Sequence, residues 1–137
     1  MAKCTTKLRV RYAEVDRLGA VNSSRYFEWF ELGRSDLLRE LGLPYSGLEA
    51  DGVMLPVVEA GCMYIAKLGY DEVVRIETTI EVLSPVRLRF HFQVFRTDDT
   101  AETLAAEGFT EHAVVGPSGK PARLSGDILA RLEGRPD

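Results

Sequence analysis

One long apolar helix near the N-terminus is the feature that most constrains what this chain can fold into. From about residue 24 to residue 41, apolar and small residues recur at steps of four, three, four and four, which is the spacing of a single helix face. This face is formed by Tyr26, Phe30, Gly33, Leu37 and Leu41. Further aromatic residues widen the apolar zone, so the first half of the helix is expected to be buried on most sides. Such a helix needs a sheet packed around it.

The remaining segments predict the strands of that sheet. Residues 54–66 are largely apolar, which predicts a strand buried on both faces. Three other segments alternate with the period of two that is typical of half-buried strands, and a further long strand follows them. These four segments are residues 7–12, 73–83, 87–95 and 103–115. We therefore predict a single α+β domain over residues 1–137, with the four later strands in an antiparallel meander against the helix.

The ends of the helices carry recognisable signals. Gly42 is a natural residue for the C-terminal end of the long helix, and Pro44 cannot continue it. Residues 45–53 are predicted to form a loop or a short helix. Ser125 is a candidate N-cap for a short terminal helix through Leu132.

The composition argues against several functional classes. The 17 Lys and Arg residues are outnumbered by 21 Asp and Glu, which argues against a basic face for nucleic acid. No apolar run approaches the ~20 residues needed to span a bilayer, and the N-terminus lacks the apolar stretch of a secretory signal. Cys4 and Cys62 have no metal-type spacing. We therefore expect a cytoplasmic protein with no nucleic-acid partner, no membrane span and no metal site.

The transition from the first strand to the long helix carries the candidate chemistry. Asp16 lies in a turn-forming segment just before the helix begins. A helix N-terminus presents unpaired backbone N–H groups and the positive end of the helix dipole, which together can hold an oxyanion. An adjacent carboxylate can act as a nucleophile or as a general base for water. These are the minimum parts for hydrolysing an activated acyl compound, and the alternative is that Asp16 only forms a turn or cap.

The run from Arg11 to Gly42 resembles the start of the 4-hydroxybenzoyl-CoA thioesterase-like family of acyl-CoA thioesterases. In that family an aromatic residue follows a basic strand, and the catalytic Asp is followed by a Gly three residues later and a Tyr ten residues later. The matching residues in this chain are Tyr12, Asp16, Gly19 and Tyr26. Looser matches lie at residues 55–59, 69–72 and 119–123, so the resemblance covers nearly the whole chain.

The resemblance implies the hotdog fold, in which a curved, antiparallel five-stranded sheet wraps a long central helix. It also implies a homodimer, often assembled into a homotetramer, with acyl-CoA at the subunit interface. Asp16 would match the catalytic carboxylate, and the backbone N–H near Ser23 would match the donor to the thioester carbonyl. The resemblance implies no metal or redox cofactor, because coenzyme A is part of the substrate.

Two positions depart from the family pattern. Many members carry a His seven residues after the Asp, where this chain has Ser23, and Arg25 replaces the Asn or Ser that precedes the helix Tyr. A histidine-dependent step in this loop is therefore not expected. The backbone donor is retained, because every residue except proline supplies an N–H. Ser23 and Ser24 are expected to add hydroxyl contacts to the acyl group, beside Tyr26.

Further candidate residues lie in the later strands and near the C-terminus. Glu59 lies in the segment predicted to be buried, where a carboxylate must be paired or face water in a cleft, and it is a candidate substrate contact. Arg87, Arg89 and Arg123 are candidate contacts for the CoA phosphates, because the guanidinium group suits phosphate geometry. A solvated strand face explains Arg87 and Arg89 equally well.

The leading hypothesis is an acyl-CoA thioesterase that releases a carboxylic acid and free CoA, with Asp16 as nucleophile or general base. The residues leave three alternatives open. A hydratase on the same fold usually needs a His in the site, and His91 and His112 are expected at surface or ladder positions instead. The chain could also bind acyl-CoA without turnover, as a sensor, or act on acyl groups attached to an acyl carrier protein.

Overall fold

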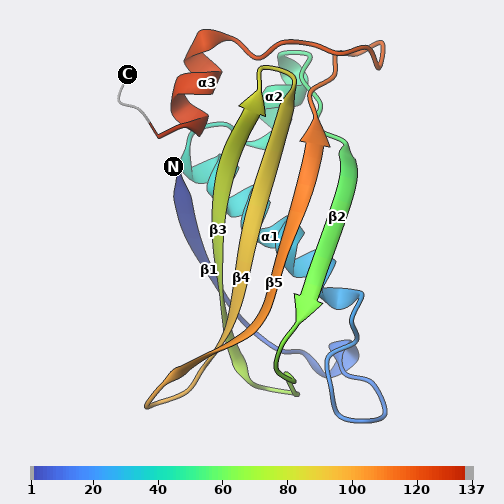
Figure 1. The fold of residues 1–137 in the computed structure, drawn as a ribbon, viewed down its shortest axis with the longest axis vertical. Coiled ribbons are helices and arrows are strands. Elements are labelled where there is room, and N and C mark those ends of the chain that lie inside the picture. The colour runs from blue at the N-terminus through green and yellow to red at the C-terminus, as the bar shows by residue number, and fades with distance from the viewer. Residues whose placement is uncertain (1, 135–137) are drawn as a thin grey trace.

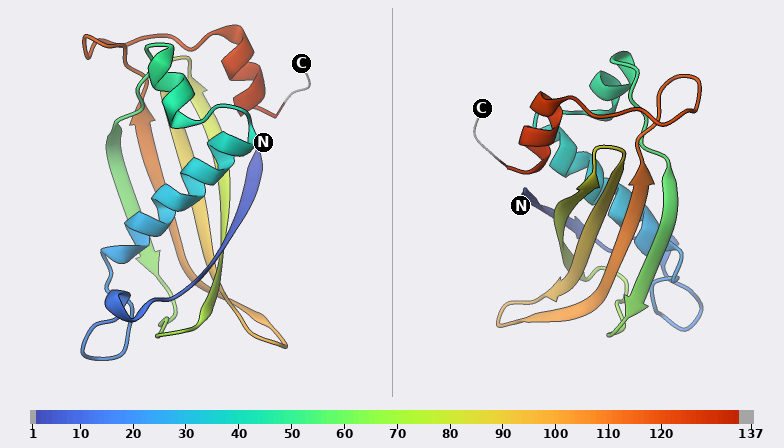
Figure 2. Two further views of the ribbon diagram at one scale, coloured as in Figure 1. Left: turned by 180° about the vertical axis from the view of Figure 1, so that it is seen from behind. Right: turned by 45° about the horizontal axis from the view of Figure 1, so that its top comes forward.

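The computed structural model describes residues 2–134, which form a five-stranded antiparallel sheet and three α-helices (Figure 1). The strands are β1 (Lys3–Arg9), β2 (Val57–Tyr64), β3 (Val73–Ser84), β4 (Arg87–Thr97) and β5 (Glu102–Ala113). The helices are α1 (Arg25–Glu40), α2 (Tyr45–Ala50) and α3 (Gly126–Leu132), with a short 3-10 helix at Tyr12–Glu14. Helix α1 runs diagonally across one face of the curved sheet, which stays open (Figure 2). This is the arrangement that the resemblance implied.

The order of strands differs from the predicted meander. The sheet runs β1-β3-β4-β5-β2, and every neighbouring pair is antiparallel. Only β3, β4 and β5 form a meander, so the prediction is wrong for β2, which pairs with β5 at the edge. Residues 65–72, here called the crossover segment, carry the chain from the end of β2 to the start of β3 (Figure 1). In the sheet, β4 and β5 lie between these two strands. A connection of this length is not restricted to a hairpin between neighbouring strands.

Strand β2 is exposed, which corrects the prediction of a strand buried on both faces over residues 54–66. One edge of β2 pairs with β5, and its other edge faces no strand formed by residues 2–134. Its apolar side chains and the next residue are each 46% to 65% exposed, namely Val57, Val58, Met63, Tyr64 and Ile65. The prediction failed because an apolar run is typical of a buried strand but does not show whether that strand lies at the centre or at the edge of the sheet.

Two glycines let α1 pack closely against the sheet. A Cβ at Gly33 would clash with the Thr78 hydroxyl on β3, and a Cβ at Gly108 would clash with the Phe30 ring. Phe30 in turn stacks on Phe92 of β4, with ring centroids 4.4 Å apart. The helix and the centre of the sheet therefore share one core, in which both phenyl rings are fully buried.

The side of α1 that faces away from the sheet is open to solvent. Phe27 and Leu32 on this side are 36% and 49% exposed, so the first half of the helix is not buried on most sides as predicted. The reason is that one curved sheet covers only one flank of a helix.

The predicted helix ends are confirmed. Gly42 has φ +75°, a left-handed conformation that ends α1, and the Ser125 hydroxyl accepts a hydrogen bond from Ile128 N at 3.3 Å. The first strand was placed too late at residues 7–12, because β1 ends at Arg9 and the 3-10 helix follows. No helix among the described residues is long and apolar enough to cross a membrane.

His112 occupies a ladder position on β5, opposite Leu88 of β4 and Val57 of β2, but it is buried in the core and not at the surface. It is 1% exposed, and its Nδ1 donates to the carbonyl of Leu55 at 2.8 Å. Because that carbonyl can only accept, Nε2 of the neutral ring accepts from the Thr110 hydroxyl, also at 2.8 Å. Burial, with a smaller contribution from the Arg34 charge, lowers the pKa of His112 from 6.5 to about 4.

This burial makes stability depend on pH. The unfolded chain takes up a proton on this histidine as the pH falls through 6.5, whereas the folded chain stays neutral down to about pH 4. The free energy of unfolding should therefore decrease as the pH falls from 6.5 to 4, and His112→Gln should flatten this part of the profile. Urea unfolding at a series of pH values measures both slopes, and an unchanged slope in the variant would contradict the assignment.

The hydroxyl of Thr78 is buried and, within residues 2–134, has no hydrogen-bond partner. Thr78→Val removes this unpaired group and keeps its shape, so it should raise the free energy of unfolding by about 1 kcal/mol. Thr110→Val is the matched control, because the buried Thr110 hydroxyl is bonded to His112, and its loss should cost about 1–3 kcal/mol. Chemical denaturation of both variants tests the contrast, and a destabilised Thr78→Val would contradict it.

Candidate active site

The Asp16 loop, residues 15–24 between the 3-10 helix and α1, forms a tight hairpin. Val15 pairs with Val21, and Asp16 N donates to Ala20 O at 2.8 Å. The side chain of Asp16 closes the same turn, because its Oδ1 accepts from Leu18 N at 2.9 Å and from Ala20 N at 3.2 Å. The turn-forming role considered from the sequence is therefore present in the structure.

This turn leaves the carboxylate available for chemistry. Asp16 is exposed, and no hydrogen bond from residues 2–134 occupies its second oxygen, Oδ2. A carboxylate held through one oxygen has a fixed direction, while its other oxygen remains open to a ligand or to water. The structural and the catalytic interpretations of Asp16 are thus compatible.

The N-terminus of α1 supplies open backbone donors a few residues along the same loop. The Asn22 side chain accepts from both Ser24 N and Ser24 Oγ, at 3.0 and 2.8 Å, and so orders the residues that precede the helix. Among the described residues, the backbone N–H groups of Ser23 and Tyr26 have no hydrogen-bond partner. These two groups lie at the positive end of a 16-residue helix, where a carbonyl oxygen or an oxyanion is stabilised.

A cavity of about 250 Å³ opens between this loop and the end of β2. It is lined by Ala20, Val21, Ser23, Tyr26 and residues 64–68. The Tyr64 hydroxyl donates to Ser23 O at 2.6 Å, and its ring packs edge-on against Tyr26 with centroids 4.9 Å apart. Burial raises the pKa of Tyr26 to about 12, so its hydroxyl stays protonated at neutral pH. The structure therefore places Ser23 and Tyr26 around one cavity, together with Tyr64.

The crossover segment holds the Asp16 loop through hydrogen bonds. Val21 N donates to Leu68 O at 2.8 Å, and the Lys67 ammonium donates to Leu18 O at 3.0 Å. Leu68 is fully buried. Sequence analysis missed Tyr64 and Lys67, because neither residue carries a pattern that shows a contact with a loop more than 40 residues away.

Glu14, two residues before Asp16, is a buried carboxylate that the sequence analysis did not single out. It accepts hydrogen bonds from Arg11 N at 2.7 Å and from Trp29 Nε1 at 2.8 Å, and its ion pair with the Arg11 guanidinium measures 3.4 Å. Burial alone would raise the pKa of this carboxyl, but the hydrogen bonds from Arg11 and Trp29 outweigh burial and hold the pKa below its usual value. Glu14 is therefore charged at neutral pH.

The other predicted site residues lie away from Asp16 in the chain. Arg87 and Arg89, at the start of β4, donate to Glu111 at 2.9 and 2.8 Å, as a solvated strand face would predict. Glu59, near the start of β2, and Arg123, before α3, are both exposed. All four lie toward the end of the sheet opposite the Asp16 loop (Figure 1). One chain therefore does not bring them to Asp16.

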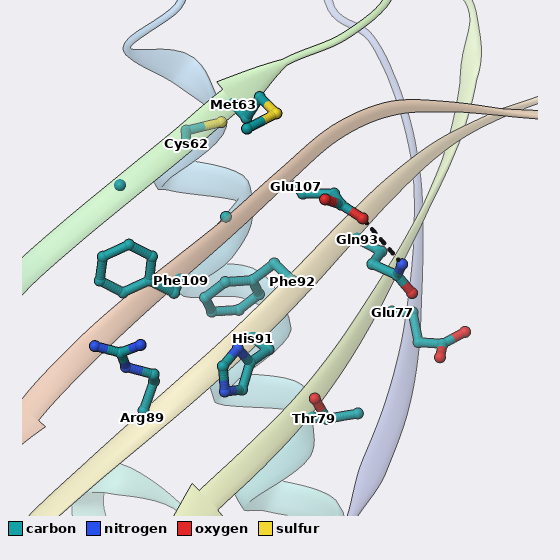
Figure 3. Close-up of a pocket in the computed structure, with 12 residues that line it drawn as sticks. Cys62, Met63, Glu77, Thr79, Arg89, His91, Phe92, Gln93, Glu107 and Phe109 are labelled. Atoms are coloured by element: carbon teal, nitrogen blue, oxygen red, sulfur yellow. Dashed lines mark hydrogen bonds between the residues drawn. The ribbon is translucent and has the colours of Figure 1, made fainter.

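A larger cavity of about 570 Å³ lies on the face of the sheet that points away from α1 (Figure 3). Its charged and polar groups already have partners in the chain, as in the pairs His91–Glu81 at 3.0 Å and Gln93–Glu107 at 3.4 Å. Asp16 lines neither cavity, but the smaller one is lined by Ser23 and Tyr26 at the N-terminus of α1, whereas the larger one includes no helix N-terminus. The smaller cavity is therefore the better candidate for catalysis. Residues 2–134 contain no group of His, Cys, Asp or Glu side chains that could hold a metal ion.

Comparison with known proteins agrees with this geometry. Residues 10–132 match the family model of the thioesterase-like superfamily. The chain belongs to this superfamily. Membership of this superfamily makes it a thioester hydrolase and confirms the family resemblance seen in the sequence.

Solved structures show the same fold. A hypothetical protein of Thermus thermophilus, TT1821, is 39% identical with a TM-score of 0.86, covering 95% of this chain and 97% of that one. The DHNA-CoA thioesterase of Staphylococcus aureus is 29% identical with a TM-score of 0.88, covering 98% of this chain and 91% of that one. A 4-hydroxybenzoyl-CoA thioesterase complexed with 4-hydroxybenzoyl-CoA has a TM-score of 0.87 at 18% identity, covering 96% and 99%, and shows the shared hotdog fold.

Proposed function

We propose that this thioester hydrolase acts on an acyl-CoA, with Asp16 as its catalytic carboxylate. The observation that carries the proposal is the placement of an exposed, directed carboxylate in the loop that leads into the N-terminus of α1, where the N–H groups of Ser23 and Tyr26 have no hydrogen-bond partner among the described residues. The similarity to a Staphylococcus aureus enzyme named as a CoA thioesterase supports CoA as the carrier of the acyl group.

The geometry assigns a role to each group. The thioester oxygen accepts from the backbone N–H of Ser23, and the helix dipole stabilises the negative charge that develops on it. In one route, Asp16 Oδ2 attacks the carbonyl carbon, the C–S bond breaks, and water hydrolyses the acyl-aspartyl anhydride. In the other route, Asp16 takes a proton from the water that attacks this carbon, and the proton passes to the departing sulfur. Both routes yield a carboxylic acid and free CoA, and neither requires a metal or redox cofactor.

We also propose that a second copy of the chain completes the site. The apolar residues of β2 and the open edge of this strand are the surface that a copy would cover. Two edge strands related by a two-fold axis pair antiparallel, so the start of one β2 lies beside the end of the other. This reversal moves the partner's Glu59 toward the Asp16 loop. In the same way, the end of the partner's sheet, with its copies of Arg87, Arg89 and Arg123, comes toward the Asp16 loop. There these arginines contact the phosphates of the bound CoA.

Hydroxyl contacts from Ser23 and Ser24 to the acyl group belong to the same proposal. Both side chains are exposed, Ser23 lines the cavity together with the buried Tyr26, and Ser24 is the next residue in the chain. A cytoplasmic location fits the two cysteines, which are both free in the structure.

Asp16→Asn should lower turnover of the best acyl-CoA by at least about 100-fold, because it removes the group that attacks or activates water. Binding of the CoA ester should change little, since the loop hydrogen bonds through Oδ1 are retained. The measurement is free-thiol release from short, long, branched and aromatic acyl-CoAs, together with calorimetric binding. Acid quench and mass spectrometry of the intact protein distinguish the two routes by the presence or absence of an acyl-aspartyl species.

Other outcomes of this assay would favour the alternatives. Tight binding without turnover in the wild-type protein would make it an acyl-CoA sensor. An unsaturated product without free thiol would make it a hydratase or dehydratase. Turnover of acyl groups only on a carrier protein would replace CoA as the substrate class. Near-normal turnover by Asp16→Asn would overturn the role of Asp16.

The proposed dimer has a separate test. Val58→Lys combined with Met63→Lys places two charges on β2 and should convert the native dimer or tetramer into a monomer with lower turnover. Leu83→Lys, on an apolar residue of β3 that is 44% exposed, should change neither property. Light scattering gives the mass of each variant. A double variant that keeps both its assembly and its turnover would exclude β2 as the interface.

A further inference from the structure

The buried carboxylate of Glu14 has no part in the mechanism above, yet it lies two residues from Asp16. It is 3% exposed, and its two oxygens receive Arg11 N, Trp29 Nε1 and the Arg11 guanidinium. A buried charge is costly unless it is fully hydrogen-bonded, so this arrangement holds the carboxylate in one position.

The backbone of Glu14 is also bonded to the segment that leads to the open N–H groups. Its carbonyl accepts from Asn22 N at 2.9 Å, and Asn22 immediately precedes Ser23. One residue therefore contacts both arms of the Asp16 loop, the arm that leads to the carboxylate and the arm that leads to the open N–H groups.

The third contact of Glu14 is with α1 itself. Trp29 is 1% exposed and packs against Tyr26, with ring centroids 4.9 Å apart. A side chain fixed in this way is a rigid point of attachment for the loop. Glu14 is absent from the lining of the cavity that contains Ser23 and Tyr26, and instead lines a groove between β1 and α1. The Glu14 side chain is therefore placed to hold the loop through Trp29 and Arg11, away from the cavity beside Ser23.

We propose that Glu14 is a positioning residue, which fixes the Asp16 carboxylate relative to the Ser23 N–H by bonding the Asp16 loop to Trp29 of α1. This inference rests on the proposed function of Asp16. Its energetic reason is that a misplacement of ~1 Å between reacting groups can cost on the order of 100-fold in rate.

Glu14→Gln is the most direct variant. Each carboxylate oxygen faces an N–H donor, so the amide of Gln would place its own NH₂ against one of them. We expect kcat to fall roughly 10- to 100-fold with KM changed by less than about threefold, because the substrate contacts stay in place. Trp29→Phe removes only the indole donor, keeps an aromatic ring in the core, and should lower kcat to a smaller extent.

Glu28→Gln is the matched control. Glu28 pairs with Arg25 three residues earlier, as Glu14 pairs with Arg11, but Glu28 is exposed, and within residues 2–134 its hydrogen bonds go to Arg25 of α1 and not to the Asp16 loop. It should keep wild-type kcat and KM. The contrast separates the buried contact with α1 from a general effect of removing a negative charge near the helix N-terminus.

Amide hydrogen exchange supplies a readout that does not need activity. The N–H groups of Leu18 and Ala20 donate to Asp16 Oδ1, so they report whether the carboxylate is held. Glu14→Gln should raise their exchange rates by roughly 10-fold, while amides in the centre of β3 and β4 keep wild-type rates. If the wild-type protein hydrolyses no thioester, the proposed function fails, but this measurement still decides whether Glu14 holds the loop.

The outcomes distinguish a positioning role of Glu14 from a purely structural one. A lower kcat with faster exchange confined to the Asp16 loop supports the inference. Wild-type kcat in folded Glu14→Gln overturns it, and so does faster exchange spread equally over the sheet, which would mark a purely structural role. If Glu14→Gln does not fold, Trp29→Phe decides, and wild-type kcat and loop exchange in that variant overturn the inference.

Discussion

The close approach of α1 to the sheet is the constraint on which the other features depend. Where Gly33 and Gly108 lack side chains, the helix and strands share one aromatic core around Phe30 and Phe92. This packing fixes the diagonal direction of α1 across the sheet (Figure 2). It thereby sets where the N-terminus of the helix lies, at the end of the sheet where the crossover segment passes. The electrostatic properties of that end follow from the direction of the helix.

Hydrogen bonds within the chain hold the loop that precedes α1. A backbone bond to Leu68 and a side-chain bond from Lys67 hold it on one side, and Glu14 holds it on the other. Asp16 contributes to this order with one oxygen and offers the second to solvent. Preorganisation of this kind means that groups need little rearrangement when charge develops in a reaction, which is the main source of electrostatic catalysis.

The single chain buries its core residues but leaves part of its apolar surface exposed. The open edge and apolar side chains of β2 remain uncovered, and the arginines expected at the CoA phosphates lie at the far end of the sheet. Both features have one explanation if a second copy pairs with β2, because a two-fold axis reverses the strand direction. A serine at position 23 still supplies the backbone donor, since that donor does not depend on the side chain.

The sequence by itself determined the elements and the candidate chemistry. Periodicity located α1 and the strands β3, β4 and β5, and the motif around Asp16 indicated the family and a candidate catalytic carboxylate. These signals are local, because they depend on spacing within one segment. Tertiary structure alone decided that β2 lies at an edge, that His112 is buried, and that Glu14, Tyr64 and Lys67 converge on the Asp16 loop. Those outcomes depend on contacts between segments far apart in the chain, and no spacing within a segment encodes such contacts.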